Sequence, residues 1–370
     1  MAIIATREQL GSFSQWRDEF SNERKDARYY EIVNDTLAEP AADYRYLLVA
    51  SGAVQPFFII DQDLLAGGGA AAQRFATAVR RVWPRFLKMR TLMVGCAAGE
   101  GHLADETAAA ELAAELPHVA KQFRSPLIVM KEFPSRDRAA LEPLRAHGFT
   151  RVPSMPMTRL NIMYDNFDDF VARRLSKPTR KNLRRKLRAA DASQPPIELQ
   201  VVSDVRPFVH EIYPLYLAVH ARSPLHFEKL TKEFLCALGE RMPDKVRFFI
   251  WRRGGRAIAF SLCMIHDDAI YDEYLGLDYS VALDLHLYFY TLRDIINWAI
   301  EHGLTWYVSS ALNYEPKLHL KCELVPLDLY VRHTSPFVNA IMKRLLPLLE
   351  PTRNDPVLHR FANFSEVWPS

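Results

Sequence analysis

Apolar and polar positions in the first half of the chain predict short strands separated by helices. Runs rich in aliphatic and aromatic residues predict strands over 46–50, 55–60, 90–94 and 126–131. Helices are predicted over 70–88, 105–123 and 138–147, the last ended by Gly148. An irregular strand over 149–160, interrupted by two prolines, closes this half near residue 162.

The second half repeats this layout after a basic helix. Strands are predicted over 197–202, 246–251, 257–266, 269–275, 304–309 and 326–332. Helices are predicted over 177–190, 206–221, 225–242, 285–302 and 315–322. A chain of 370 residues is long enough for two domains. We therefore predict an α/β protein with domains over 1–162 and 163–335, each a mixed sheet flanked by helices, and a tail over 336–370 that is helical at 337–349.

Composition and charge narrow the class of protein. Hydrophobic residues make up 49% of the chain, which is enough for a full core in each half. The net charge is only +3, but residues 173–188 hold nine Lys and Arg side chains and no acid. The four cysteines form no C-x-x-C pair, and no apolar run approaches the roughly 20 residues that cross a bilayer. We expect a cytoplasmic protein with no transmembrane segment, and no metal-binding motif is visible.

Three segments taken in order carry a resemblance to a known family. They are FDDFVARRLSKPTRKNLRRKLR, LDLHLYFYTLRDIINWAIEHGL and NYEPKLHL. Their order and spacing resemble the GNAT superfamily of acyl-CoA N-acyltransferases, in its FemAB-like, peptidoglycan-biosynthesis branch with two GNAT domains in tandem. The resemblance covers roughly residues 125–332. It implies a fold of two tandem GNAT-like domains, each with a mixed, mostly antiparallel, twisted sheet, and it implies acyl transfer to an amine.

The phosphate loop of the superfamily is missing from the second half, where Gly276-Leu277-Asp278-Tyr279 stands in its place. The first half has the sequence CAAGEG at 96–101, between a predicted strand and a predicted helix. Its Gly99 and Gly101 N–H groups could face a pyrophosphate at the start of that helix, or the segment could be a plain turn.

Acyl transfer to an amine needs a base, a polarised carbonyl and a proton for the leaving group. In the strand IYDEYL, alternation puts Asp272 and Glu273 on opposite faces. The resemblance makes one of the two the base, and spacing does not decide which. It also makes Tyr314 the acid and Lys317 a contact for an anionic group. The alternatives are an ion-paired strand acid, a core tyrosine and a solvated lysine.

His286 begins the predicted helix 285–302 and could serve as a base or a phosphate donor, or be a structural hydrogen-bonding residue. In the basic helix, Arg180, Lys181 and Arg184 lie on a broad positive face that could hold the phosphates of CoA. The same face could instead be solvated, dock an acyl carrier protein or aminoacyl-tRNA, or meet an anionic membrane.

We therefore predict an N-acyltransferase that moves an acyl group from acyl-CoA or an acyl carrier to an amine of an amino acid, amino sugar or cell-envelope metabolite. The alternative within enzymes is an aminoacyl-tRNA-dependent transferase of the FemX type. The alternative from another class is a non-catalytic GNAT-like binding module.

Overall fold

Two compact units make up the chain, and neither is continuous in sequence. The computed structural model describes residues 2–13, 15–37, 41–63, 74, 77–81, 88–223 and 227–368. Unit 1 comprises Met1–Ser154, Pro224–Leu230 and Pro326–Asn354. Unit 2 comprises Met155–Ser223, Thr231–Val325 and Asp355–Ser370. The helix predicted over 70–88 lies mostly outside the described residues.

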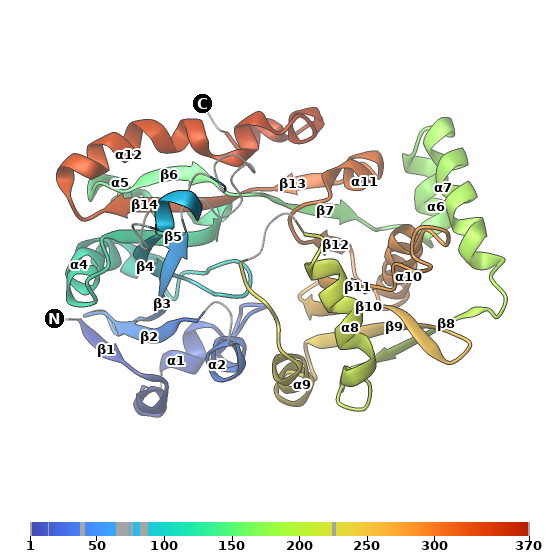
Figure 1. Ribbon diagram of the computed structural model, residues 1–370, viewed down its shortest axis with the longest axis horizontal. Coiled ribbons are helices and arrows are strands. Elements are labelled where there is room, and N and C mark those ends of the chain that lie inside the picture. Colours follow the sequence, from blue (N-terminus) through green and yellow to red (C-terminus); the bar gives the residue numbers. More distant parts are fainter. Residues whose placement is uncertain are drawn as a thin grey trace. The chain divides into compact units, whose positions relative to one another are not determined.

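Unit 1 is built on a seven-stranded sheet in the order β1-β2-β3-β4-β5-β14-β6 (Figure 1). Its strands are β1 (Ile3–Ala5), β2 (Asp43–Leu48), β3 (Val54–Asp63), β4 (Lys88–Val94), β5 (Leu127–Pro134), β14 (Leu327–His333) and β6 (Thr150–Pro153). Neighbouring strands are antiparallel except β4 and β5, which are parallel.

Alternating side chains of this sheet bury two different faces. Leu47 and Phe57 point into a core formed with α4 (Ala109–Gln122), whereas Tyr46, next to Leu47, contacts the Trp16 ring of α1 (Gln15–Glu19). Helices therefore cover both faces. The other helices of unit 1 are α2 (Ala27–Thr36), α5 (Glu142–Ala146), α12 (Pro336–Leu349) and the short 3-10 turns η1 (Arg7–Ser12), η2 (Glu106–Ala108), η3 (Ser135–Arg138) and η4 (Pro351–Asn354).

Unit 2 has a second seven-stranded sheet in the order β13-β7-β12-β11-β10-β9-β8 (Figure 1). Its strands are β13 (Glu323–Val325), β7 (Met157–Asn161), β12 (Trp306–Ser309), β11 (Ala269–Leu277), β10 (Arg256–His266), β9 (Val246–Arg253) and β8 (Ile197–Val202). Again a single neighbouring pair, β11 with β12, is parallel.

The two sheets match strand for strand, with one exchange between the halves of the sequence. In unit 1 the antiparallel neighbour of β5 is β14, which comes from the end of the chain. In unit 2 the corresponding neighbour of β12 is β7, which comes from the first half. The strand predicted over 149–160 is therefore two strands, and they belong to different sheets. The strand predicted over 326–332 lies in the first sheet, so a single cut at residue 162 does not separate the two units.

Helices also cover both faces of the sheet in unit 2. One core holds Phe170, Leu183 and Ile295 of α6 (Phe167–Arg174), α7 (Lys177–Asp191) and α10 (Leu287–Glu301). Helix α8 (Val209–His220) packs on β10 and β11. A Cβ on Gly276 of β11 would lie 2.7 Å from the Tyr216 backbone nitrogen and against the Phe260 ring, so this approach requires glycine.

Most second-half elements agree with the sequence-based prediction, but one helix is shorter. The helix predicted over 225–242 begins only at Lys232, as α9 (Lys232–Arg241), because residues 227–230 run through unit 1. The remaining elements are α11 (Tyr314–His319), η5 (Leu358–Arg360) and η6 (Phe364–Glu366). Across the part of the chain that the structure describes, no helix combines the length and apolar character needed to cross a bilayer.

Candidate functional site

The parallel strands β11 and β12 separate at one defined point, and the candidate site lies there. Their pairing runs from Ala269 opposite Trp306 to Asp272 opposite Ser309. On the other edge of β11, the register with β10 shifts after Asp272, so Glu273 is an extra residue in the ladder. A bulge of this kind bends a strand and redirects its side chains. Asp272 is thus the last residue of β11 that pairs with β12.

Hydroxyl groups from both neighbouring strands hold the Asp272 carboxylate. Ser261 of β10 donates to its Oδ1, and Tyr307 of β12 donates to its Oδ2 over 2.7 Å. Desolvation raises the pKa of Asp272, while the two hydroxyl hydrogen bonds and the nearby Lys317 act in the opposite direction. A carboxylate whose pKa is raised by burial is suited to accept a proton.

Lys317 supplies the positive charge next to this carboxylate. It lies on α11 with 4% of its surface exposed, and its Nζ donates to the carbonyl oxygens of Ser310 and, over 2.8 Å, Leu312. Burial lowers its pKa to about 8, and the charge of Asp272 partly offsets that effect. The Lys317 amine is therefore mostly protonated at neutral pH and loses its proton at mildly alkaline pH.

The loop that Lys317 binds has an unusual backbone. Leu312 and Asn313 have φ values of 73° and 50°, the left-handed region that costs energy for residues other than glycine. Two carbonyl groups of the loop converge on one ammonium group, and this supports its shape. Backbone strain held by a buried charge is typical of functional sites.

Further polar groups lie in the region of Asp272 and Lys317. Burial raises the pKa of the Tyr288 hydroxyl, and the charge of Asp272 adds to that effect. Burial also raises the pKa of the Cys322 thiol to about 12, so this thiol stays protonated. Thr158 of the exchanged strand β7 lies 3.2 Å from Ser309, hydroxyl to hydroxyl. The exchanged strand therefore contributes to this region.

Two predicted residues of this region have other surroundings. The Tyr314 hydroxyl is buried and donates to the Pro156 carbonyl over 2.8 Å, and its ring packs against Phe361. The role of acid would require this hydrogen bond to break, so the structure favours the alternative of a core tyrosine. Glu273 is the bulge residue and does not share the hydrogen bonds of Asp272.

His286 lies at the start of α10 with φ 49°, in the left-handed region. Burial lowers its pKa, and so do the charges of Lys186 and Arg185 on the basic helix. Cations of α7 therefore act on the pKa of His286, whereas Lys317 acts on the pKa of Asp272.

The basic helix predicted over 177–190 is α7. Ser176 caps its first turn and accepts a hydrogen bond from the Thr179 N–H. Leu183 and Leu187 form the buried side of the helix. Among the described residues, no acidic side chain pairs with the exposed cations of this helix, which are Lys177, Lys181, Arg184, Arg185 and Arg188, although Arg185 donates to the Asn182 side chain. Of the predicted phosphate contacts, Arg180 instead donates to the Ala172 carbonyl. Five cations thus remain open to an anionic ligand.

The predicted glycine loop lies at the corresponding point of unit 1, where β4 and β5 separate after Val94 and Met130. Here the Gly101 N–H already donates to the carbonyls of Lys131 and Glu132, at 3.2 Å each. The Lys131 Nζ donates to the Gly99 carbonyl over 2.8 Å. The loop is therefore folded onto β5, and a phosphate at Gly101 would have to displace backbone hydrogen bonds.

Buried charges fill the space next to this loop. Glu100 pairs with Arg24 and, over 2.7 Å, with Lys25, and all three are at most 5% exposed. Burial lowers the pKa of the neighbouring His102 to about 4. A Cβ on Gly99 would overlap the Lys25 amine, so glycine is needed for this packing. The arrangement is that of a closed core.

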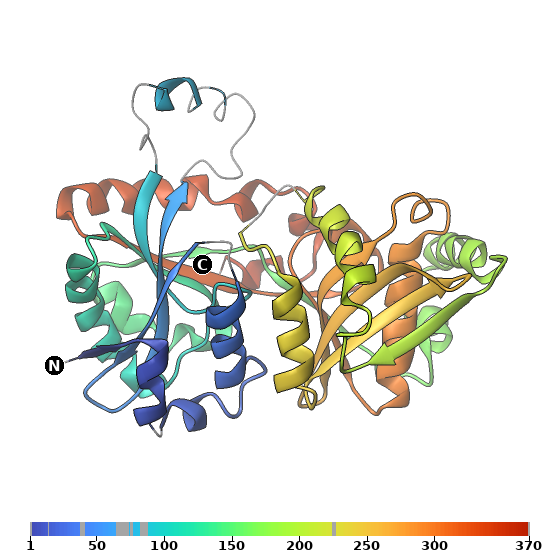
Figure 2. The same cartoon turned by 60° about the horizontal axis from the view of Figure 1, so that its bottom comes forward.

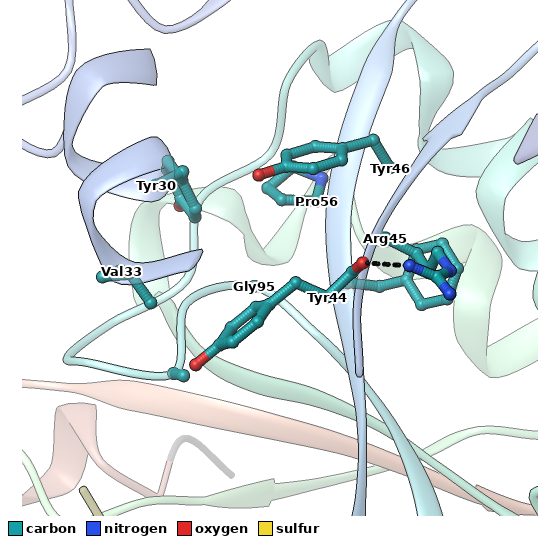
Figure 3. A pocket seen from close by; sticks show the side chains of 9 residues that line it. Tyr30, Val33, Tyr44, Arg45, Tyr46, Pro56 and Gly95 are labelled. Carbon is teal, nitrogen blue, oxygen red and sulfur yellow. Dashed lines mark hydrogen bonds between the residues drawn. The ribbon is translucent and has the colours of Figure 1, made fainter. Parts of the chain in front are cut away.

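A small hollow in unit 1 lies between α2 and β2, next to Gly95 (Figure 3). Tyr30 and Tyr44 line it, and their buried hydroxyl groups have no hydrogen-bond partner among the described residues. None of the predicted site residues lines it. Within the described part of the chain, no group of His, Cys, Asp and Glu side chains is arranged to hold a metal ion.

Sequence reasoning missed the partners of Asp272. Ser261 lies in an apolar strand and Tyr307 in a short buried one, and neither belongs to a recognisable motif. The available signal was register: a polar side chain in a central strand points to a partner on the next strand. That signal requires knowing which strands pair and where the bulge lies.

Comparison with known proteins identifies the family. A FemAB-like family model, described as peptidoglycan biosynthesis/recognition, matches residues 93–314. No curated protein sequence matches the chain.

Solved structures share the whole fold at low sequence identity. L-PGS from Bacillus licheniformis aligns with a TM-score of 0.54 at 14% identity, covering 92% of this chain and 97% of that one. The C-terminal domain of a putative lysylphosphatidylglycerol synthetase from Agrobacterium fabrum aligns with a TM-score of 0.53 at 13% identity. This alignment covers 92% of this chain and 96% of that domain. FemX aligns with a TM-score of 0.52 at 12% identity, and the alignment covers 89% of this chain and 96% of FemX. The predicted fold class, two tandem GNAT-like domains, is confirmed.

Proposed function

Because the chain belongs to the FemAB-like family, we propose that it transfers an acyl or aminoacyl group to an amine of a cell-envelope precursor, at the point in unit 2 where β11 and β12 separate. Family and fold together make it a transferase of the acyl type. The observation that supports the location is the half-buried Asp272 carboxylate, held by hydroxyl groups of two strands. The buried Lys317 amine, which a strained loop holds, is near enough to lower the pKa of that carboxylate.

The pair supplies the two charges that the reaction needs. Asp272 takes a proton from the acceptor ammonium group, and the freed amine attacks the donor carbonyl carbon. A C–N bond forms as the bond from that carbon to the leaving oxygen or sulfur breaks. Lys317 stabilises the negative charge on the carbonyl oxygen, gives a proton to the leaving group, and takes in its place the second proton that the nitrogen loses as the amide forms. No covalent intermediate with the enzyme is required.

The donor we favour is aminoacyl-tRNA, the FemX-type alternative. Unit 2 lacks the superfamily's phosphate loop, and the Gly101 N–H of unit 1 is already hydrogen-bonded within the backbone. In contrast, α7 presents five exposed cations without acidic partners among the described residues. A long polyanion can contact the cations of this 15-residue helix along its length.

The first experiment measures binding of bulk aminoacylated bacterial tRNA and of acetyl-CoA by the purified full chain, over a range of salt concentrations. We expect tRNA to bind with a steep salt dependence and acetyl-CoA to bind weakly. The variant Lys181→Gln/Arg184→Gln should reduce the salt slope by about two phosphate contacts. The control Lys88→Gln/Lys121→Gln removes the same charge from exposed positions of unit 1.

The second experiment measures transfer from labelled donors to a panel of amines. Acetyl-CoA that binds tightly and supports transfer, with no effect of tRNA, would replace the proposed donor and leave the site unchanged. If Asp272→Asn and Lys317→Met both transfer at the wild-type rate, the site itself is wrong.

A further inference from the structure

Helix α12 of unit 1 presents an apolar face to solvent. Half of the large hydrophobic side chains found exposed in the described part of the chain lie on this one helix. They are Phe337, Ile341, Leu345 and Leu348, exposed by 76%, 44%, 46% and 60%. Their spacing of four, four and three residues puts them in one stripe along the helix. Scattered exposed hydrophobic residues are ordinary, but a continuous stripe marks a binding surface.

The stripe is not the consequence of a loosely attached helix. The other face of α12 packs on β14 and β6, as Figures 1 and 2 show. Asn339 on that face accepts a hydrogen bond from the His333 N–H over 2.9 Å and donates to the Gly148 carbonyl over 2.9 Å. Helix α12 is therefore fixed to unit 1 by one side while its apolar side faces outward.

The charged side chains of α12 itself have one sign. The helix contains Lys343 and Arg344 and no acidic residue, and both cations are exposed. Arg344 is seven residues from Phe337, which puts it on the same side as the stripe. The next acid, Glu350, is buried, and its carboxylate accepts from the Thr352 N–H and hydroxyl. A partner for this surface must therefore be apolar and carry negative charge.

The dimensions of the helix decide how it would meet a lipid bilayer. With 14 residues, α12 is about 21 Å long, which is too short for a hydrocarbon core of about 30 Å. A helix with a large apolar face and flanking cations lies in the plane of the interface instead. Long Lys and Arg side chains can then extend to the headgroups.

We propose that α12 binds the surface of an anionic lipid bilayer, with Phe337, Ile341, Leu345 and Leu348 among the acyl chains and Lys343 and Arg344 at the headgroups. The proposal does not depend on the reaction carried out in unit 2. A lipid surface satisfies both requirements at once, because it offers apolar depth and a layer of negative charge over the full length of the helix.

Co-sedimentation of the full chain with vesicles tests this. We expect binding to phosphatidylcholine vesicles that contain one-quarter phosphatidylglycerol, and much weaker binding to phosphatidylcholine alone. Changing all four stripe residues to Gln should lower the partition coefficient at least tenfold, since each loses apolar burial. Lys343→Gln/Arg344→Gln should lower it about fivefold for each cation at low salt.

The control variant Met163→Gln/Leu283→Gln changes two residues of unit 2 that are 69% and 74% exposed, and it should bind like the wild type. Thermal unfolding checks that each variant is folded. Absence of vesicle binding by the wild type, or equal binding by the stripe variant, overturns the proposal. A wild-type dimer in sedimentation equilibrium that the stripe variant converts to a monomer, without vesicle binding, assigns the surface to self-association instead.

Discussion

Replacing Lys317 by Met should change how the stability of the protein depends on pH. Burial lowers the pKa of Lys317 to about 8 in the folded protein, against an ordinary value of 10.5. Between these two values the unfolded chain binds more protons than the folded one. Unfolding free energy therefore rises with pH through this window. At pH 7 both states are protonated, and the folded protein bears the full cost of the buried charge.

The size of the effect follows from the shift. A difference of about 2.5 pKa units corresponds to about 3 kcal/mol over the full window. Between pH 7.0 and 9.5, where a protein is easily handled, the wild type should gain about 2 kcal/mol from this one group. Methionine binds no proton, so Lys317→Met should lack that gain. Lys317 is almost fully buried, so solvent screening should reduce the value little.

Urea unfolding followed by tryptophan fluorescence at the two pH values gives the comparison. The measured quantity is the change with pH in the stability difference between the wild type and Lys317→Met. Lys181→Met, at an exposed position of α7, is the control and should track the wild type. A stability difference that stays constant within about 0.5 kcal/mol would show that Lys317 titrates normally, and the reasoning from burial would fail.

Three further outcomes are expected. Asp272→Asn should slow transfer at least about hundredfold, because the amide accepts no proton, and it should lower the melting temperature only slightly, because the amide nitrogen cannot accept one of the two hydroxyl hydrogen bonds; steady-state rates and thermal unfolding measure this. His102 has its pKa lowered to about 4, so stability should fall by up to about 3 kcal/mol as the pH drops from 6.5 to 4, and His102→Leu should lack this acid loss in urea unfolding. Gly276→Ala should cost more than about 3 kcal/mol, because its Cβ would meet the Phe260 ring, whereas Gly11→Ala, with open space around it, should be neutral in the same assay.

Much of the secondary structure could be predicted because it depends on neighbouring residues. Strands β9, β10 and β11 and helix α10 lie within a few residues of their predicted ranges. Alternation, a Gly-Gly turn and a terminal glycine are local signals. The exchange of β7 and β14 left no such signal. Which sheet each of these strands joins depends on partners far away in the sequence, so the pattern of either strand alone could not assign it.

The candidate site could be predicted only in part. Resemblance to the family pointed to Lys317 and to either Asp272 or Glu273, and in the structure the charge of Lys317 acts on Asp272. Their fixed partners Ser261 and Tyr307 come from different strands, and only the register with its bulge aligns them. The role of Tyr314 stays a prediction, because sequence spacing gives no information on where a hydroxyl points; in the structure this hydroxyl donates to the Pro156 carbonyl.

The duplicated fold suggests why chemistry is expected in one unit. In unit 2 the parallel strands separate after a carboxylate, and the following loop turns back to surround a buried lysine with carbonyl groups. In unit 1 the equivalent position is Val94, and the loop after it bonds to β5 through Gly101. Buried ion pairs of Lys25 and Glu100 then fill the adjoining space. The same separation of parallel strands thus holds Asp272 and Lys317 in unit 2, whereas in unit 1 it is closed by packing.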